Sequence, residues 1–353
     1  MSSGVIVQEA DLGGERAVLV AALHRFLTPH LTPEQCERRF DWLYGGGPHG
    51  RPRAWIAREA GGAVIGAAAA FPRRLRLGTN EIAGWVLGDF CIHPEFRSLG
   101  PAVQLQRVFV DEAKAGRFRF WYDFPSAGMV AVHRRLAIRP THEVIRMAKP
   151  LRVERKLEGV LRSRLLASFL AAPANWILGM RDTPRGGPDG CVFELATGRC
   201  GPDFTELDRS VGPGLGLSTV RSAEYLNWRY LDHPLQRYGI LAARQRGELQ
   251  GYVVFSAPER GTDAPIVDLV GADGSAVLPA LVRALTARLR AAGVTTASFP
   301  LLATHAWMPW IRNLGFRPRE RSPLVIAGQA GDAGVTHLER GGRWHLVAGD
   351  RDL

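Results

Sequence analysis

The order of predicted secondary-structure elements recurs in the two halves of the chain. In each half, a short strand and helical stretches precede a group of strands, and strand and helix then alternate. The first half has expected strands at 4–10, 53–59, 63–71, 81–93, 118–124 and 144–147, and helices at 15–26, 33–43, 101–115 and 127–136. The second half has expected strands at 192–195, 238–244, 249–256, 265–270 and 295–301, and helical stretches at 204–210, 222–230, 276–292 and 304–314. This self-similarity predicts a tandem repeat of one fold.

The same pattern predicts the fold class. Two runs separated by Gly61-Gly62 are typical of a hairpin, and the later alternation of helix and strand is typical of a crossover unit. We therefore expect an α/β (α+β) protein with two lobes, each a mixed, mostly antiparallel sheet flanked by helices. The turn-rich run 183–190, Thr-Pro-Arg-Gly-Gly-Pro-Asp-Gly, is the strongest linker signal in the 353 residues. We expect a first lobe at 1–150, a helical linker at 151–190 and a second lobe at 191–353.

Charge and cysteine usage limit the partners. The formal net charge of +11 indicates affinity for an anionic ligand, but the basic residues are mostly arginine and are spread along the chain, so we expect no specific nucleic-acid partner. The four cysteines lack the close pairing of a metal site, which predicts reduced thiols and no metal. Two arginines and an asparagine interrupt the most apolar stretch, 160–180, and no signal peptide is visible. We expect a cytoplasmic protein without a membrane span.

A strand, a tight turn and a helix follow one another at the most informative stretch of the sequence. The strand ends in Ile92-His93-Pro94, the turn contains Arg97-Ser98-Leu99-Gly100, and Pro101-Ala102 open an amphipathic helix. The free amides at such a helix N-terminus attract a phosphate group, and Arg97 adds a charge-assisted contact. Pro101 has no amide hydrogen, so the turn offers one donor fewer, although proline suits a first helical turn.

This stretch resembles the signature of the GNAT superfamily, a strand ending in a Val-x-Pro-like triplet followed by Arg/Gln-x-x-Gly-x-Gly/Ala. The resemblance implies an acyl-CoA donor, either acetyl-CoA or a longer acyl-CoA, bound in the first lobe. It assigns the coenzyme contacts to Cys91, Ile92, Arg97, Ser98, Leu99, Gly100 and Ala102. Backbone amides near Cys91 and Ile92 would polarise the thioester carbonyl. The Cys91 thiol itself is interpreted as a small core group, because no paired base accompanies it.

Two residues of the first lobe are candidates for proton transfer. Asp89 stands on the strand before the turn, where related enzymes often place a carboxylate that contacts the acceptor; the alternative is a strand-end aspartate with a local hydrogen bond. His133 aligns with the family's tyrosine that protonates the departing thiolate, if Leu136-Ala137-Ile138 is matched to the Leu-Gly-Phe triplet. The alternative is a solvated helix residue.

The second half resembles the same superfamily in the phrase 225–234 and in Asn313-Leu314-Gly315-Phe316. Its equivalent turn, 271–276, has neither Arg nor Gln and contains Asp273, and Ile311 stands at the tyrosine position. We therefore expect this lobe to have lost catalysis while forming part of an acceptor cleft. The candidate substrate-binding residues are Tyr225, Trp228 and Arg229, and the alternative is that they pack their helix against its sheet.

Taken with the resemblance, the sequence predicts an acyl-CoA-dependent N-acyltransferase whose acceptor is an amine-bearing small molecule, an amino sugar, an amino acid or a peptide. The small side chains of 67–70 suggest room for a longer acyl chain, against the alternative of a tightly packed core. Two other functions stay open. One is a Fem-like transferase with an aminoacyl-tRNA donor, and the other is a non-catalytic acyl-CoA-binding or scaffold protein.

Overall fold

The computed structural model describes residues 4–96, 99–153, 188, 190–257, 263–329 and 331–351. The first half contains β1 (Ile6–Glu9), α1 (Arg16–Phe26), α2 (Pro33–Tyr44), β2 (Arg53–Arg58), β3 (Val64–Leu77), β4 (Asn80–Ile92), η1 (Pro94–Phe96), α3 (Leu99–Lys114), β5 (Phe120–Asp123), α4 (Ala127–Arg135) and β6 (His142–Pro150). The order and type of the elements expected in this half are confirmed.

The second half is also built from strands and helices in the expected order. It contains β7 (Cys191–Leu195), α7 (Pro202–Val211), η2 (Gly212–Leu215), β8 (Leu217–Thr219), α8 (Ala223–Leu226), η3 (Asn227–Leu231), β9 (Tyr238–Gln245), β10 (Glu248–Ser256), β11 (Asp263–Gly271), α9 (Val277–Ala291), β12 (Thr296–Leu302), α10 (Met308–Asn313), β13 (Arg317–Gly328), α11 (Ala333–Glu339), β14 (Trp344–His345) and η4 (Ala348–Asp350). The elements after residue 316, and β8, were not predicted. The predicted linker at 151–190 lies outside the described residues apart from 151–153, 188 and 190.

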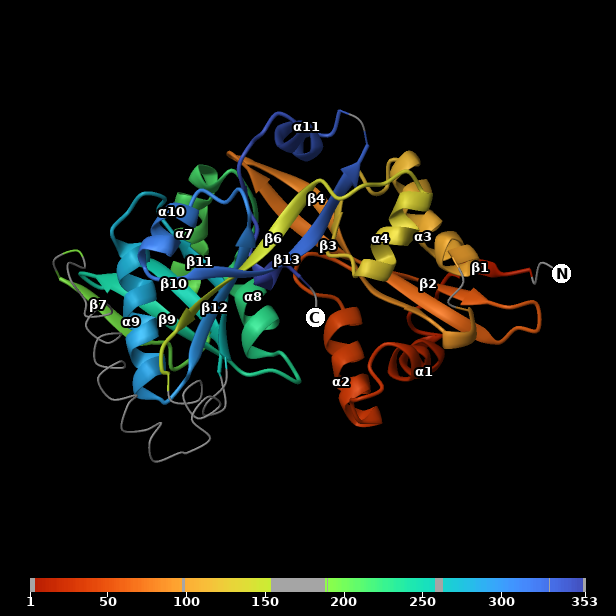
Figure 1. The fold of residues 1–353 in the computed structure, drawn as a ribbon, viewed down its shortest axis with the longest axis horizontal. Helices are drawn as coiled ribbons and strands as arrows, with labels where there is room; N and C mark the ends of the chain where they lie inside the picture. Colours follow the sequence, from red (N-terminus) through yellow and green to blue (C-terminus); the bar gives the residue numbers. More distant parts are fainter. Residues whose placement is uncertain are drawn as a thin grey trace.

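The two halves exchange strands and so share one sheet (Figure 1). In the described part of the chain the order of the main run is β1-β2-β3-β4-β5-β13-β6-β12-β11-β10-β9-β7. The C-terminal end of β13, 325–328, pairs with β5, and its earlier part, 317–324, pairs with β6. Although the sequence predicts that the strand at 144–147 completes the first unit, β6 lies between β13 and β12. The physical reason is burial: Ile145 and Met147 belong to the apolar core of the second half.

Helices cover both faces of the sheet. In the first half, α1 and α2 pack on one face and α3 and α4 on the other, each pair over its own apolar core. In the second half, α9 and α10 cover one face, and α7 and α8 cover the other. The C-terminal segment returns to the first half, because Val335, Leu338 and Trp344 are buried in the core beneath α1 and α2.

Local signals explain the helix that borders the site. Thr32 caps α2 by accepting a hydrogen bond from the Gln35 amide, and the Gln35 side chain accepts one from the Thr32 amide, which completes a capping box. Pro33 occupies the first turn, where its missing amide hydrogen costs nothing. The helix buries Arg39, Phe40, Leu43 and Tyr44 against the sheet. The helix therefore holds the guanidinium of Arg39 and the phenol of Tyr44 in fixed positions facing β4.

The four consecutive alanines of β3 are closely packed. Ala67, Ala68, Ala69 and Ala70 are at most 2% exposed and lie in the packed cores of the first half. The alternative of a tightly packed core therefore describes this stretch, and it leaves no room for an acyl chain.

Among the described residues, every helix is too short or too polar to cross a lipid bilayer.

Candidate active site where two parallel strands diverge

A crevice opens where β4 and β5 separate. The two strands run parallel, with α3 as the crossover between them, and they pair only at Trp85 with Trp121 and Val86 with Tyr122. Beyond these pairs, β4 contains a bulge: Ala69 pairs with Gly88 and Ala67 with Cys91, so β4 has one residue more than β3 over the same span. A bulge of this kind bends its strand, and the pairing of β4 with β5 ends before it.

Asp89 stands in this bulge with φ of 48°, a left-handed conformation that aspartate tolerates better than most residues. The bulge also resets the alternation of the strand. Leu87 belongs to the core under α3 and α4, whereas Cys91 belongs to the core under α1 and α2. Asp89 consequently points toward α2, on the same side as Cys91.

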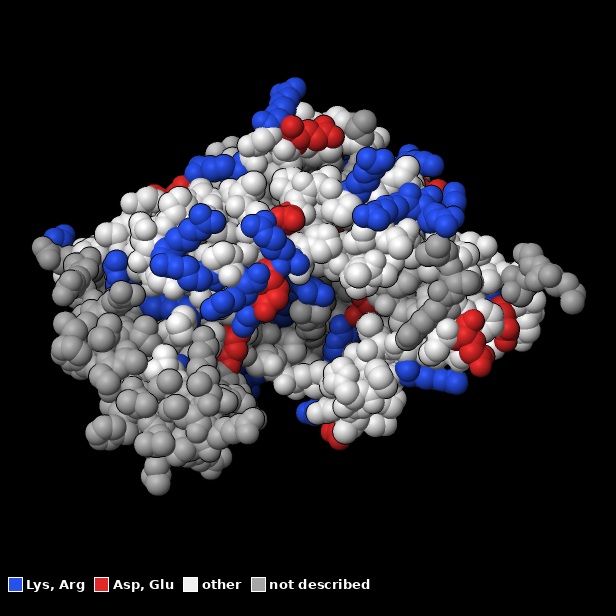
Figure 2. Space-filling model, viewed as in Figure 1, with Lys and Arg blue, Asp and Glu red and all other residues white. Residues whose placement is uncertain are grey.

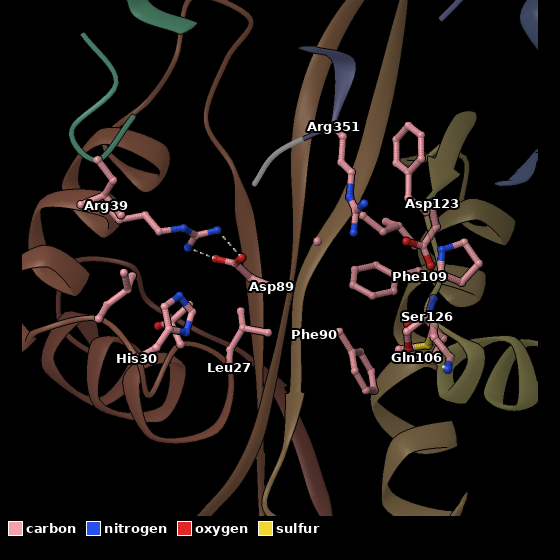
Figure 3. A pocket seen from close by; sticks show the side chains of 18 residues that line it. Leu27, His30, Arg39, Asp89, Phe90, Gln106, Phe109, Asp123, Ser126 and Arg351 are labelled. Carbon is pink, nitrogen blue, oxygen red and sulfur yellow. Dashed lines mark hydrogen bonds and ion pairs between the residues drawn. The ribbon is translucent and has the colours of Figure 1, made fainter. Parts of the chain in front are cut away.

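A cavity of about 530 Å³ occupies the crevice, within the usual size range of small-molecule sites. Its walls come from the loop between α1 and α2, from β4, from α3 and from the start of α4 (Figure 3). The lining side chains that carry polar or charged groups are those of Thr28, His30, Arg39, Asp89, Gln106, Asp123, Ser126 and Arg351. Leu27, Leu87, Phe90, Phe109 and Met129 supply apolar surface.

Asp89 forms one wall of the cavity and is held by three donors. The Arg39 guanidinium donates two hydrogen bonds to its carboxylate at 2.7 and 2.8 Å, and the Tyr44 hydroxyl donates a third at 2.9 Å. The side chains of Arg39 and Asp89 are only 10% and 3% exposed. Burial, followed by the charge of Asp89, raises the pKa of Tyr44 well above its usual value, so the phenol stays protonated and donates. The Asp89 carboxylate is thus built into a buried ion pair.

His133 lies behind the opposite wall. Its side chain is fully buried, and its Nε2 is 2.7 Å from Oδ2 of Asp123, the last residue of β5. The ring also stacks on Trp121. The alternative of a solvated helix residue is therefore wrong, because α4 packs this turn against β5. His133 does not line the cavity, whereas Asp123 does, so the carboxylate separates the imidazole from any ligand.

The predicted coenzyme residues are distributed around the N-terminal end of α3. Cys91 and Ile92 are buried, and burial raises the pKa of the Cys91 thiol to about 12, so it is a neutral core group. Ala102 is buried in the core under α3 and α4. Leu99 is the first residue of α3, and Gly100 follows it with an exposed backbone. Arg97 and Ser98 lie outside the described residues.

A second, larger cavity of about 830 Å³ lies next to the first at the boundary between the two halves. Both cavities are lined by the same five residues, namely Phe124, Pro125, Ser126, Leu235 and Arg351. The rest of the second cavity is lined from β6, β9, β11, β12, β13, the loop before β9 and the C-terminal segment. Figure 2 shows the surface hollowed between the two halves, with basic side chains gathered over β6 and β13 beside the hollow.

The three predicted substrate-binding residues take different positions. Tyr225 is buried and stacks on His49 with ring centroids 4.3 Å apart. Trp228 stacks on Trp42, and each indole donates a hydrogen bond to the other residue's carbonyl, at 2.8 and 3.2 Å. These two residues therefore pack the second half against α2 and the loop that follows it. Of the three, Arg229 alone lines one of these two cavities, the second one.

Arg229 anchors the C-terminal segment rather than pointing a free charge at a ligand. Its guanidinium donates hydrogen bonds to the carbonyls of Gly349 and Arg351, at 3.1 and 2.6 Å. It also lies 5.7 Å from the centre of the Trp42 ring, where a cation–π contact is favourable. Arg229 thus fixes the backbone that carries Arg351 into both cavities.

A corresponding pair of parallel strands in the second half also diverges. β11 and β12 pair only at 263–265 with 296–298, with α9 between them in the chain. Here, however, the C-terminal segment fills the gap: Val347 bridges to Leu301, and Gly349 packs against the carbonyl of Val267. Asp350 is held in place by Arg221 at 3.1 Å. The chain itself therefore occupies the second crevice.

The turn that precedes α9 differs from the turn before α3 in its charge. Asp273 accepts hydrogen bonds from the Trp307 indole at 3.1 Å and from Arg343 at 2.6 Å. A carboxylate held at this point disfavours a phosphate group. In the first half the gap between the parallel strands is open, whereas in the second half the C-terminal segment lies in the gap and forms one wall of the second cavity.

Comparison with known proteins identifies the fold. No protein-family model matches the chain, and no curated protein matches it. Among solved structures, a GCN5-related N-acetyltransferase from Anabaena variabilis is 14% identical with a TM-score of 0.64, covering 92% of this chain and 72% of that one. A tandem GNAT protein from the clavulanic acid biosynthesis pathway is 14% identical with a TM-score of 0.55, covering 92% and 98%. The Saccharomyces cerevisiae N-myristoyltransferase with bound myristoyl-CoA is 12% identical with a TM-score of 0.58, covering 92% and 79%.

The chain therefore has the GNAT fold, and the predicted class, a mixed α/β protein with two GNAT-like lobes, is confirmed. The structure adds three residues to the site that sequence reasoning missed. Arg39 lies in an amphipathic helix, and nothing in the sequence near it indicates that it pairs with Asp89. Asp123 is the last residue but one of the strand predicted at 118–124, shortly before the helix predicted at 127–136, and polar residues at such positions often serve function, so it could have been noticed. Arg351 lies near the chain end and reaches the cavity only through tertiary structure.

Proposed function

We infer that this protein is an acyl-CoA-dependent N-acyltransferase whose single donor site is the crevice between β4 and β5. One observation carries the proposal: the parallel strands that α3 connects diverge beside an open cavity, which Gln106 and Phe109 of that helix line, while in the second half the C-terminal segment bridges to β12 in the equivalent gap. The fold supports the proposal, because similar structures are described as N-acetyltransferases and as a transferase with bound myristoyl-CoA.

The N-terminal end of α3 fits a phosphate-bearing donor. A Cβ atom built on Gly100 would meet no atom of the described residues within 4 Å, and its φ is not left-handed. The fold itself therefore does not require glycine there, and close approach of a ligand gives a reason for it. We propose that Arg97, Ser98, Leu99, Gly100 and Ala102 surround the pyrophosphate, and that backbone amides near Cys91 and Ile92 face the thioester. Acetyl is the donor group we favour, since Ala67–70 are packed.

Asp123 is the carboxylate we assign to the acceptor amine. Its side chain is 13% exposed and lines the open cavity, whereas the Asp89 oxygens already accept three hydrogen bonds. His133 is a positioning residue: its buried Nε2 fixes the Asp123 carboxylate from behind. Asp89, paired with Arg39, forms a charged wall of the same cavity. The catalytic assignment of the sequence therefore moves from Asp89 to Asp123, and His133 acts through Asp123.

In the transfer step, Asp123 takes one proton from the ammonium group of the acceptor, directly or through water. The freed nitrogen lone pair attacks the thioester carbonyl carbon, so a C–N bond forms and the C–S bond breaks. The new amide nitrogen then loses a second proton. One of the two protons ends on the coenzyme thiolate and the other in solvent. The chain contributes proximity, carbonyl polarisation and a held base.

The proposal includes a reducing, cytoplasmic setting. All four cysteines are free, and Cys36, Cys91 and Cys200 are buried as thiols. Such buried thiols fit a compartment that keeps them reduced.

Turnover tests the proposal. The purified chain is incubated with acetyl-CoA or longer acyl-CoAs and a panel of primary amines, and the released thiol and the acylated product are measured. Asp123→Asn is expected to lower kcat roughly 100-fold or more while leaving acyl-CoA binding unchanged. His133→Gln is expected to lower kcat less and to shift its pH profile, without changing the KM of the donor. No turnover with any acyl-CoA, or full turnover in Asp123→Asn, would contradict the assignment.

A further inference from the structure

Arg351 lines both cavities, and among the described residues it has no acidic side chain at ion-pair distance. Four arginines line the cavities, and three are engaged by the protein. Arg39 pairs with Asp89, Arg146 pairs with Asp263 and Glu320, and Arg229 binds two main-chain carbonyls. For the fourth, Arg351, the described residues provide a ring contact, with the guanidinium 5.6 Å from the centre of the Phe124 ring, and no hydrogen bond or ion pair from its guanidinium.

The surroundings of Arg351 favour an anionic ligand group. The residue is partly accessible to solvent and lines both cavities, and Figure 3 shows its side chain directed toward the side on which Asp123 lies. Desolvation by the surrounding protein lowers the pKa of Arg351, and the nearby Asp123 carboxylate only partly opposes this effect. Asp123 is therefore close enough to act on the charge but does not reach ion-pair distance. A carboxylate from a ligand would complete this site with charge-assisted hydrogen bonds.

The main chain holds Arg351 in place. The Arg229 guanidinium binds the carbonyl of Arg351 at 2.6 Å, and Arg229 itself is 3% exposed. The Arg351 amide donates to the carbonyl of Ala348 at 3.2 Å. A guanidinium carried on a fixed backbone loses less conformational entropy when it binds an anion than one on a loose chain end.

Two opposite charges at one junction select a particular kind of amine. Asp123 attracts an ammonium group, and Arg351 attracts an anion close to it. The cavity beyond them holds about 830 Å³, more than two small charged groups need, and it is lined largely by apolar side chains, including Val144, Leu235, Tyr238, Val267 and Leu346. An acceptor with an amine and a carboxylate near each other and an apolar body would use all three features.

We propose that the acceptor is an amino acid with a large apolar side chain, whose carboxylate binds Arg351, whose amine faces Asp123 and whose side chain fills the second cavity. This inference rests on the proposed function, since the amine is the group that the acyl transfer consumes. It narrows the acceptor from any primary amine to one that carries its own carboxylate.

The test compares matched acceptors with saturating acetyl-CoA: L-phenylalanine, L-phenylalaninamide and 2-phenylethylamine. The wild-type chain is expected to acetylate the acid with a kcat/KM roughly tenfold or more above that of the amide and the decarboxylated amine. Arg351→Gln should remove this preference by slowing the acid and leaving the amide unchanged, and Arg351→Lys should keep part of it. Arg139→Gln, at an exposed position between α4 and β6, is the matched control and should behave as wild type.

Calorimetry with acetyl-CoA separates the two levels of the account. A chain that binds acetyl-CoA but acetylates acid and amide equally, or acetylates none of the three amines, overturns the acceptor inference and leaves the donor site standing. A preference for the acid that survives in Arg351→Gln also overturns it. A chain that binds no acetyl-CoA overturns the proposed function itself.

Discussion

Replacing Asp89 by asparagine should destabilise the fold rather than remove a catalytic base. The substitution takes the negative charge away from Arg39, whose side chain is 10% exposed, and turns one acceptor oxygen into an amide donor. Breaking one partner of a buried ion pair costs about 3–5 kcal/mol. Because Arg39 keeps some contact with solvent, we expect the lower end, about 3 kcal/mol of unfolding free energy.

Urea unfolding at pH 7 measures this loss, and the double variant Arg39→Met/Asp89→Asn is the control. Removing both charges should cost less than the sum of the single changes, with a coupling energy of about 2 kcal/mol. Assayed in the cold, where the variant stays folded, Asp89→Asn should keep kcat within roughly tenfold of wild type, in contrast to Asp123→Asn. A stability within about 0.5 kcal/mol of wild type would refute the ion-pair reasoning. A folded Asp89→Asn variant with no activity would return the role of base to Asp89.

Three other variants test how the two halves are joined. Burial lowers the pKa of His49 from 6.5 to about 3, so the contribution of the neutral imidazole to the unfolding free energy is complete above pH 6.5 and is lost as the pH falls toward 3. His49→Phe keeps a ring stacked on Tyr225 but cannot take up a proton. In urea titrations this variant should lose about 2 kcal/mol less unfolding free energy than wild type between pH 7 and pH 5. An unchanged acid limb would contradict that burial argument. Gly349→Ala should cost about 1–3 kcal/mol, because the new Cβ overlaps the Tyr230 hydroxyl, and adding Tyr230→Phe should restore part of this loss; additive effects would mean that the C-terminal segment is not packed in the second crevice. Trp228→Ala should lower the unfolding free energy by about 2–3 kcal/mol, because the stack on Trp42 is lost. A loss no larger than that of Arg139→Ala, a control at an exposed position, would argue against this contact.

Local patterns predicted most of the elements, because their causes lie within a few residues. The capping box of α2 is one example, since Thr32, Pro33 and Gln35 fix the start of the helix without help from the rest of the chain. The crossover of β4, α3 and β5 is another, because hydrophobic periodicity and turn residues mark each boundary. The open first crevice follows from that crossover.

The pairing of strands that are far apart in the chain could not be predicted from local sequence patterns. The strand β13 begins with Arg317, Pro318 and Arg319, which are typical of an exposed loop, and it becomes a strand because β5 and β6 supply its hydrogen-bond partners. Likewise, His133 is followed by two arginines at a helix end, a pattern typical of a solvated residue. Only the packing of α4 on β5 buries it beside Asp123.

The residues of the site also divide into those that local patterns predict and those that only tertiary contacts define. Asp89 was identified from its position on β4, but its chemistry depends on Arg39, which is fifty residues earlier in the chain. Arg351 could not be predicted, since its place is set by the return of the C-terminal segment across the second crevice and by the anchoring bonds of Arg229.

The most direct test of the account is the stoichiometry of acetyl-CoA binding by isothermal titration calorimetry, with Arg97→Glu and Arg107→Glu compared with wild type. Arg107 is exposed on α3 and receives the same charge change further along the helix. The account predicts one acetyl-CoA per chain, binding lost in Arg97→Glu and retained in Arg107→Glu. Two molecules per chain, equal loss in both variants, or no binding at all would contradict a single donor site between β4 and β5.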